Sequence, residues 1–185
     1  MKQIIDEIKR ALENNLPIAA LTMALTIPDI CGRIHYYIPD VGKRYRNWFN
    51  KYVYKYYEGN FSFSLNDSSD DIKFRNFDGR LCYKLRCAIL HSGNAKIDII
   101  DKFKFYYTPP ANNPESDDYT CITFVNDRKN KYEYQLNINQ FCTIMCNAAE
   151  EFFNEPQNKC KLNNYKLIIS DTIPINTPPS LTTHN

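Results

Sequence analysis

Two residues of this chain, Arg86 and His91, combine types and spacing that suit acid–base chemistry on a phosphate. They lie in the run Leu-Cys-Tyr-Lys-Leu-Arg-Cys-Ala-Ile-Leu-His-Ser-Gly-Asn, separated by small or apolar residues. Histidine changes charge near neutral pH, and arginine is a permanent cation that can stabilise a negatively charged transition state. Metal-free phosphoryl chemistry on RNA requires both groups.

The spacing of apolar residues places this pair on one helix. The helix is expected to begin after Asp78-Gly79 and to stop at Ser92-Gly93-Asn94, where glycine suits the left-handed C-terminal conformation. On a regular helix, side chains five residues apart point about 140° away from each other. We therefore expect Arg86 and His91 to meet only if the last turn unwinds or a second subunit supplies one of them.

The elements around this helix are predicted from periodicity. Helical spacing is present over 2–14 and over 141–153, where Pro156 ends the helix. An apolar stretch from 18 to about 34 is also helical, and Pro28 either kinks or divides it. A further helix with a stripe of aromatic residues ends at 57. Alternation predicts strands over 102–106, 120–125 and 132–138, the last two pairing as a hairpin, with a further strand at 165–169 left open.

These elements predict a mainly α fold, a bundle of about five helices with a small β-hairpin inserted after the motif helix, at about 102–138. Residues 1–170 are predicted to form one domain and 171–185 a poorly ordered tail. The polar stretch 59–78 is predicted to be a surface loop.

Composition narrows the function classes. With 5 glycines in 185 residues, and no G-x-G-x-x-G or G-K-[ST] motif, a glycine-rich phosphate-binding loop is excluded. A net charge of +2 excludes an extended basic clamp, so RNA would be held over a few phosphates.

Seven cysteines, an odd number, without a secretory leader indicate the cytoplasm. The apolar run 16–28 is shorter than the roughly 20 residues of a membrane span. Cys142 and Cys146 lack companion ligands, so neither a metal nor a cofactor is expected.

An R-x4-H motif on a late helix of a small bundle, followed by Ser-Gly-Asn, resembles the HEPN family, whose motif is arginine, four to six residues, and histidine. The resemblance implies a HEPN-like bundle that forms a homodimer with two Arg/His pairs facing one cleft. It implies a metal-independent endoribonuclease, in which the ribose 2′-hydroxyl attacks the adjacent phosphate and leaves a 2′,3′-cyclic phosphate. His91 would be the general base or acid, and Arg86 would hold the phosphate. A role in a microbial defence or toxin-type system follows by analogy.

Two alternatives stay open. Many active members carry Asn, Asp or His directly after the arginine, where this chain has Cys87. That difference favours a non-catalytic HEPN module that binds RNA or a partner protein, with Arg86 and His91 kept for structure. A toxin neutralised by a partner protein, a nucleotidyltransferase that modifies it, is the other alternative.

Several neighbours are candidates for supporting roles. A partly buried Arg86 needs a counter-charge, and Asp29 is the best candidate, although it could instead pair with Arg33 four residues along its own helix. Lys84 and Asn94 adjoin the motif and are candidate substrate contacts, as is Tyr83. In the segment 43–57, aromatic residues alternate with cations; their spacing favours a buried stripe with solvated cations over a stacking surface for RNA.

Overall fold

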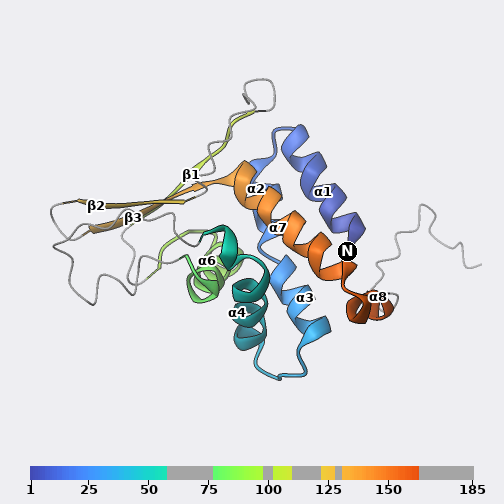
Figure 1. The fold of residues 1–185 in the computed structure, drawn as a ribbon. Coiled ribbons are helices and arrows are strands. Elements are labelled where there is room, and N and C mark those ends of the chain that lie inside the picture. The colour runs from blue at the N-terminus through green and yellow to red at the C-terminus, as the bar shows by residue number, and fades with distance from the viewer. Residues whose placement is uncertain (58–76, 98–101, 110–121, 128–130, 163–185) are drawn as a thin grey trace, which may run out of the picture.

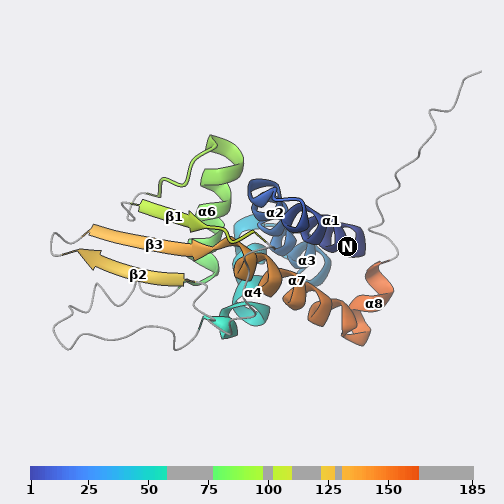
Figure 2. The same cartoon turned by 90° about the horizontal axis from the view of Figure 1, so that it is seen from above.

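The computed structural model describes residues 1–57, 77–97, 102–109, 122–127 and 131–162. These form a mainly helical fold with a small sheet at one end, which confirms the predicted fold class (Figures 1 and 2). The predicted loop at 59–78 lies almost entirely outside the described residues, and the predicted strand at 165–169 and tail at 171–185 lie wholly outside them.

The helices follow the predicted order with three differences in detail. They are α1 (Lys2–Glu13), α2 (Pro17–Ala24), α3 (Ile27–His35), α4 (Val41–Tyr52), α6 (Gly79–Ser92), α7 (Ile138–Asn154) and α8 (Pro156–Leu162). The apolar stretch is divided rather than kinked, because Pro28 occupies the first turn of α3, where its missing N–H costs nothing. The aromatic segment leaves the α-helix at Tyr52 and continues as a 3₁₀ turn, Tyr54–Tyr56. Pro156 ends α7 and also begins α8.

The apolar stretch Pro17–His35 is long and apolar enough to pass a length-and-composition test for a membrane span, and it lies near the N-terminus. In this fold the stretch is broken into α2 and α3, and half of it is buried inside the protein. A core helix passes the same test, so the stretch is weak evidence for a span.

The sheet contains the predicted hairpin and one strand more. β2 (Ile122–Asp127) and β3 (Lys131–Asn137) pair antiparallel, with Ile122 opposite Leu136. β1 (Lys102–Tyr106) lies parallel to β3 on its other side, with Phe103 opposite Tyr134, so the strand order is β1-β3-β2. β3 leads directly into α7 (Figure 2), whose first turn is capped by the Asn137 side chain accepting a hydrogen bond from the Gln140 N–H.

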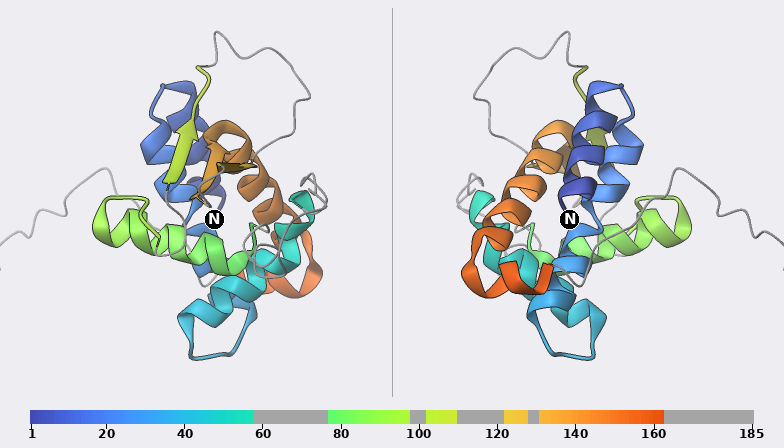
Figure 3. Two further views of the ribbon diagram at one scale, coloured as in Figure 1. Left: turned by 90° about the vertical axis from the view of Figure 1, so that its left-hand side faces the viewer. Right: turned by 90° about the vertical axis from the view of Figure 1, so that its right-hand side faces the viewer.

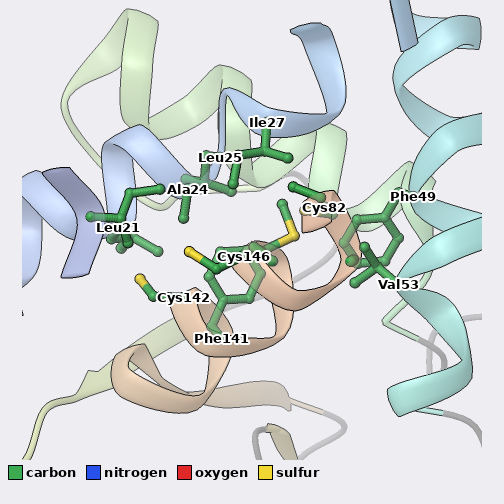
Figure 4. Close-up of a cluster of buried hydrophobic side chains, with 14 of the residues drawn as sticks. Leu21, Ala24, Leu25, Ile27, Phe49, Val53, Cys82, Phe141, Cys142 and Cys146 are labelled. Carbon is green, nitrogen blue, oxygen red and sulfur yellow. The ribbon is translucent and has the colours of Figure 1, made fainter. Parts of the chain in front are cut away.

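The core is built around α7, which packs against α2, α3 and α4. Figure 4 shows side chains from in and around α2, α3, α4 and α6 gathered around Phe141, Cys142 and Cys146 of α7. The aromatic stripe of α4 belongs to this core, since Tyr45, Trp48 and Phe49 are all 0% exposed and Tyr52 is 2% exposed. This confirms the buried stripe for these four residues, whereas Tyr56, which lies beyond the α-helix, is 37% exposed and does not belong to it.

Candidate functional site

The motif helix α6 is fixed at both ends by local chemistry. The Asp78 carboxylate accepts hydrogen bonds from the N–H groups of Arg80 and Leu81, at 3.0 and 2.9 Å, and caps the N-terminus. At the other end Gly93 has φ +63°, as the sequence predicts, and its N–H donates to the Ile89 carbonyl. The site-bearing helix therefore has a defined beginning and end.

The two halves of α6 differ in their surroundings. Gly79 lies so close to α4 that an added Cβ would be 2.6 Å from the Arg46 carbonyl oxygen. The buried residues of α6 are Gly79, Cys82 and Leu85, all in its first half. The second half reaches beyond the other helices (Figure 3), and His91 at its end is exposed. The fold thus anchors α6 by one half and presents the other to solvent.

Three of the predicted site residues meet on this projecting half. The Arg86 Nη1 atom is 2.8 Å from Nε2 of His91. On its other side the guanidinium holds Asp29 in the first turn of α3, with Nε and Nη2 at 2.9 and 2.8 Å from Oδ2. Asp29 is therefore the counter-charge of Arg86, and it pairs with Arg86 rather than with Arg33.

The expectation that Arg86 and His91 would meet only through an unwound turn or a second subunit is wrong. α6 is helical through Ser92, and both residues belong to one chain. The angle of about 140° and the rise of about 7.5 Å describe the backbone positions. The long arginine side chain runs along the helix surface and covers that separation.

The chemistry of the two groups determines how the contact between them is made. A guanidinium carries only donors, so the Nε2 atom of His91 is the acceptor of the hydrogen bond from Arg86. A histidine that accepts this bond carries its proton on Nδ1, because an imidazolium has no acceptor. Since Arg86 then occupies the lone pair of Nε2, this nitrogen can take up a proton, as a general base must, only after the arginine has moved off it.

The Asp29–Arg86 pair is largely shielded from water, with each side chain 19% exposed. Burial raises the pKa of Asp29 above its ordinary range, and the positive charge of Arg86 opposes that rise. The second carboxylate oxygen, Oδ1, is buried and has no hydrogen-bond partner among the described residues. Arg86 therefore carries most of the compensation for burying this carboxylate.

The remaining predicted residues do not join this group. Lys84 lies about 200° around α6 from Arg86 and about two turns before His91. Asn94 is occupied in the turn after the helix, where its amide donates to the Ser92 carbonyl and its carbonyl accepts from the Lys96 N–H. Among the described contacts, neither side chain reaches Arg86 or His91.

Two neighbouring features were missed or underrated from the sequence. Tyr83, one turn before Cys87, packs its ring against α4 and interacts with the Cys87 thiol. Leu90 forms one wall of a groove of about 620 Å³, whose other lining residues include Ile4 of α1, Met23 of α2 and Thr26 at the start of α3. The i, i+4 spacing of Tyr83 and Cys87 is visible in the sequence, whereas the groove depends on helix packing alone.

Metal-based chemistry finds no ready site in the part of the chain that the structure describes. No group of three or more His, Cys, Asp or Glu side chains there is arranged to hold a metal ion. Cys31, Cys82, Cys87, Cys142 and Cys146 are free thiols, and Cys87 is the one of these five that is not buried.

Comparison with family models, curated protein sequences and solved structures finds no match to this chain. What the site can do is therefore argued from its own residues: a neutral imidazole, a guanidinium beside it, and a carboxylate that holds the guanidinium in place.

Proposed function

We propose that this protein is a metal-independent endoribonuclease of the HEPN type, which acts as a cytoplasmic homodimer in a microbial defence or toxin-type system. The observation that carries the proposal is the 2.8 Å contact between Arg86 Nη1 and His91 Nε2, with Asp29 fixing the arginine from behind. It joins a proton acceptor to a phosphate-binding cation on an exposed helix end.

In the proposed reaction the bound phosphate draws Arg86 off His91, and the freed Nε2 of His91 takes the proton of a ribose 2′-hydroxyl. The 2′-oxygen then bonds to the adjacent phosphorus, and the bond from phosphorus to the 5′-oxygen breaks. The 5′-oxygen leaves with a proton from a second histidine across the dimer cleft, which begins the reaction as an imidazolium and ends it neutral. The products are a 2′,3′-cyclic phosphate and a 5′-hydroxyl end, with no oxidant, reductant or metal consumed.

Arg86 has capacity left for a phosphate in this scheme. Of the five N–H groups of a guanidinium, one from each of its three nitrogens is engaged, by Asp29 or His91. The guanidinium also interacts with the Cys87 thiol, a weak acceptor that a phosphoryl oxygen can replace. The negative charge of the phosphoryl oxygens grows in the transition state, so this exchange stabilises it. Asp29 keeps the guanidinium oriented, and so acts through Arg86 rather than on the substrate.

The test is cleavage of mixed single-stranded and structured RNAs in the presence of EDTA. His91→Ala is expected to lower the cleavage rate by about 10²- to 10⁴-fold, the usual contribution of a general acid or base. Arg86→Ala should lower it comparably, whereas His35→Gln, in α3 and bonded to Asn158, serves as the matched histidine control. Cleavage that survives both site substitutions, or that stops when metal is chelated, contradicts the mechanism.

The alternative is a non-catalytic HEPN module that binds RNA or a partner protein. The observation favouring it is that Asp29 and Arg86 form a largely buried ion pair beside Cys87, an arrangement that a purely structural role also explains. RNA binding without cleavage, weak and steeply dependent on salt, is the result that this alternative predicts. The oligomeric state, measured by sedimentation with and without RNA, tests the dimer separately.

A further inference from the structure

Tyr83 is held rigidly beside the Arg86–His91 site. An added Cβ on Gly42 of α4 would lie 3.0 Å from Cε1 and 3.2 Å from Cζ of its ring, so the ring rests directly on the glycine backbone. Its other support is Tyr45, with ring centroids 5.2 Å apart and the planes tilted by 58°. Tyr45 is itself completely buried, and its hydroxyl is bonded to the Leu25 carbonyl and the Cys82 thiol.

The hydroxyl of Tyr83 belongs to the face of α6 that also carries Arg86 and Cys87, three and four residues further along the helix. It interacts with the thiol of Cys87, and that thiol also interacts with the guanidinium of Arg86. Burial raises the pKa of Tyr83, and the neighbouring Cys87 raises it further, while Arg86 opposes the rise. The phenol therefore keeps its proton at neutral pH and is available as a hydrogen-bond donor.

The partner of this donor is a poor one. A thiol sulfur is a weak acceptor, whereas a phosphoryl oxygen is charged and forms much stronger hydrogen bonds. The Cys87 sulfur interacts with both the Arg86 guanidinium and the Tyr83 hydroxyl, so a phosphoryl oxygen that replaced it would contact both groups. The exchange of a sulfur for a phosphoryl oxygen is then favourable without any movement of the ring.

We propose that Tyr83 is a third binding group of the Arg86–His91 site, whose hydroxyl donates a hydrogen bond to a phosphoryl oxygen held by Arg86. The proposal rests on the proposed function and extends it, because it names a group that contacts the phosphate. The position directly after the arginine is Cys87, which is not a strong hydrogen-bond donor. Tyr83 would supply a stronger donor from one turn earlier on the same helix. The competing explanation is that Tyr83 only fills space against Gly42 and Tyr45, a role that phenylalanine would perform equally well.

The experiment follows the imidazole resonances of His91 by NMR during titration with inorganic phosphate, at an ionic strength kept constant with sodium chloride. The resonances are assigned with His91→Ala. Tyr83→Phe is expected to weaken phosphate binding roughly tenfold, as the loss of one hydrogen bond to a charged acceptor would. Tyr106→Phe removes an exposed hydroxyl at the end of β1 and is the matched control. Gly42→Ala, which displaces the ring but keeps the hydroxyl, should weaken binding in the same direction.

The outcomes separate this proposal from the ribonuclease proposal. Equal phosphate affinity in Tyr83→Phe and the unsubstituted protein overturns the role of Tyr83, whether or not RNA is cleaved. A phosphate titration that leaves His91 unaffected in the unsubstituted protein also overturns it. Phosphate binding that depends on Tyr83, in a protein that cleaves no RNA, supports the binding role and refutes only the nuclease. Thermal unfolding of each variant confirms that the affinities compare folded proteins.

Discussion

Replacing Arg86 with methionine removes the counter-charge of Asp29 and should destabilise the fold by about 2 kcal/mol. Two unit charges about 4 Å apart attract by about 1 kcal/mol in water and by about 4 kcal/mol at an effective dielectric constant of 20. With each side chain 19% exposed, the pair lies between these two environments. Methionine retains the aliphatic packing of the arginine stem, so the measured loss reports mainly the charge.

A double-mutant cycle isolates the pairwise part of this energy. Free energies of unfolding from urea titrations are compared for the unsubstituted protein, Arg86→Met, Asp29→Asn and the double variant. The double variant should be more stable than the sum of the single losses implies, with a coupling energy of about 2 kcal/mol. A coupling energy below about 0.5 kcal/mol would refute the argument that this pair is formed and shielded.

The pH dependence of the coupling gives a second check. Burial raises the pKa of Asp29, so the folded protein binds this proton more tightly than the unfolded chain does. The resulting stabilisation is complete below the unfolded pKa and is lost as the pH rises through the higher folded pKa. Arg86→Met raises that folded pKa further and enlarges the loss. The coupling energy should therefore be present at pH 7 and vanish in acid, where Asp29 is neutral in every state.

Three further predictions concern the scaffold and its thiols. Gly79→Ala should lower the free energy of unfolding by about 3 kcal/mol, because the added Cβ would lie 2.6 Å from the Arg46 backbone. Gly93→Ala, where φ is +63° and no atom lies within 4 Å, should lower it by only about 1 kcal/mol. Urea titrations that reverse this order contradict the packing argument. Asn158→Ala should lower the free energy of unfolding by about 2 kcal/mol, because this fully buried amide donates to the Phe152 carbonyl and to Glu155. Asn154 is exposed, so the control Asn154→Ala should change stability by less than about 0.5 kcal/mol. Iodoacetamide at pH 8 should alkylate Cys87 before the four buried cysteines, Cys31, Cys82, Cys142 and Cys146. Burial also raises the pKa of Cys146 to about 11, which lowers its reactivity further. Peptide mass spectrometry measures the order of labelling, and early labelling of Cys146 would show that the core opens.

The elements that could be predicted from the sequence are those decided by local chemistry. The period of apolar residues located the helices, and Gly93 and Pro28 marked an end and a beginning through their own backbone preferences. The parallel addition of β1 to β3 was not predicted, because it joins strands whose pairing no local turn specifies. The start of α8 at Pro156 was missed for a different reason: the same proline can end one helix and begin the next.

At the site, an electrostatic requirement proved more informative than helical geometry. A partly buried guanidinium needs a carboxylate, and that requirement identified Asp29 across 57 residues of sequence. Helical angles alone separated Arg86 from His91, because they count the direction of each Cα–Cβ bond and not the reach of a long side chain. The support of Tyr83 by Gly42 could not be foreseen, since it depends on how α4 and α6 cross.

The structural and functional explanations of Arg86 differ in one contact. A purely structural ion pair needs Nε and Nη2, which both meet Asp29 Oδ2 and which leave Oδ1 buried without a partner among the described residues. It does not need Nη1 to reach across the helix surface to an exposed imidazole, where a hydrogen bond adds little stability against water. That contact instead orients the ring and holds the phosphate-binding cation beside the imidazole, whose Nε2 becomes a proton acceptor when a phosphate draws the arginine away. Fold stability therefore explains the Asp29–Arg86 ion pair but not the exposed contact between Arg86 and His91. The ribonuclease proposal depends on that exposed contact.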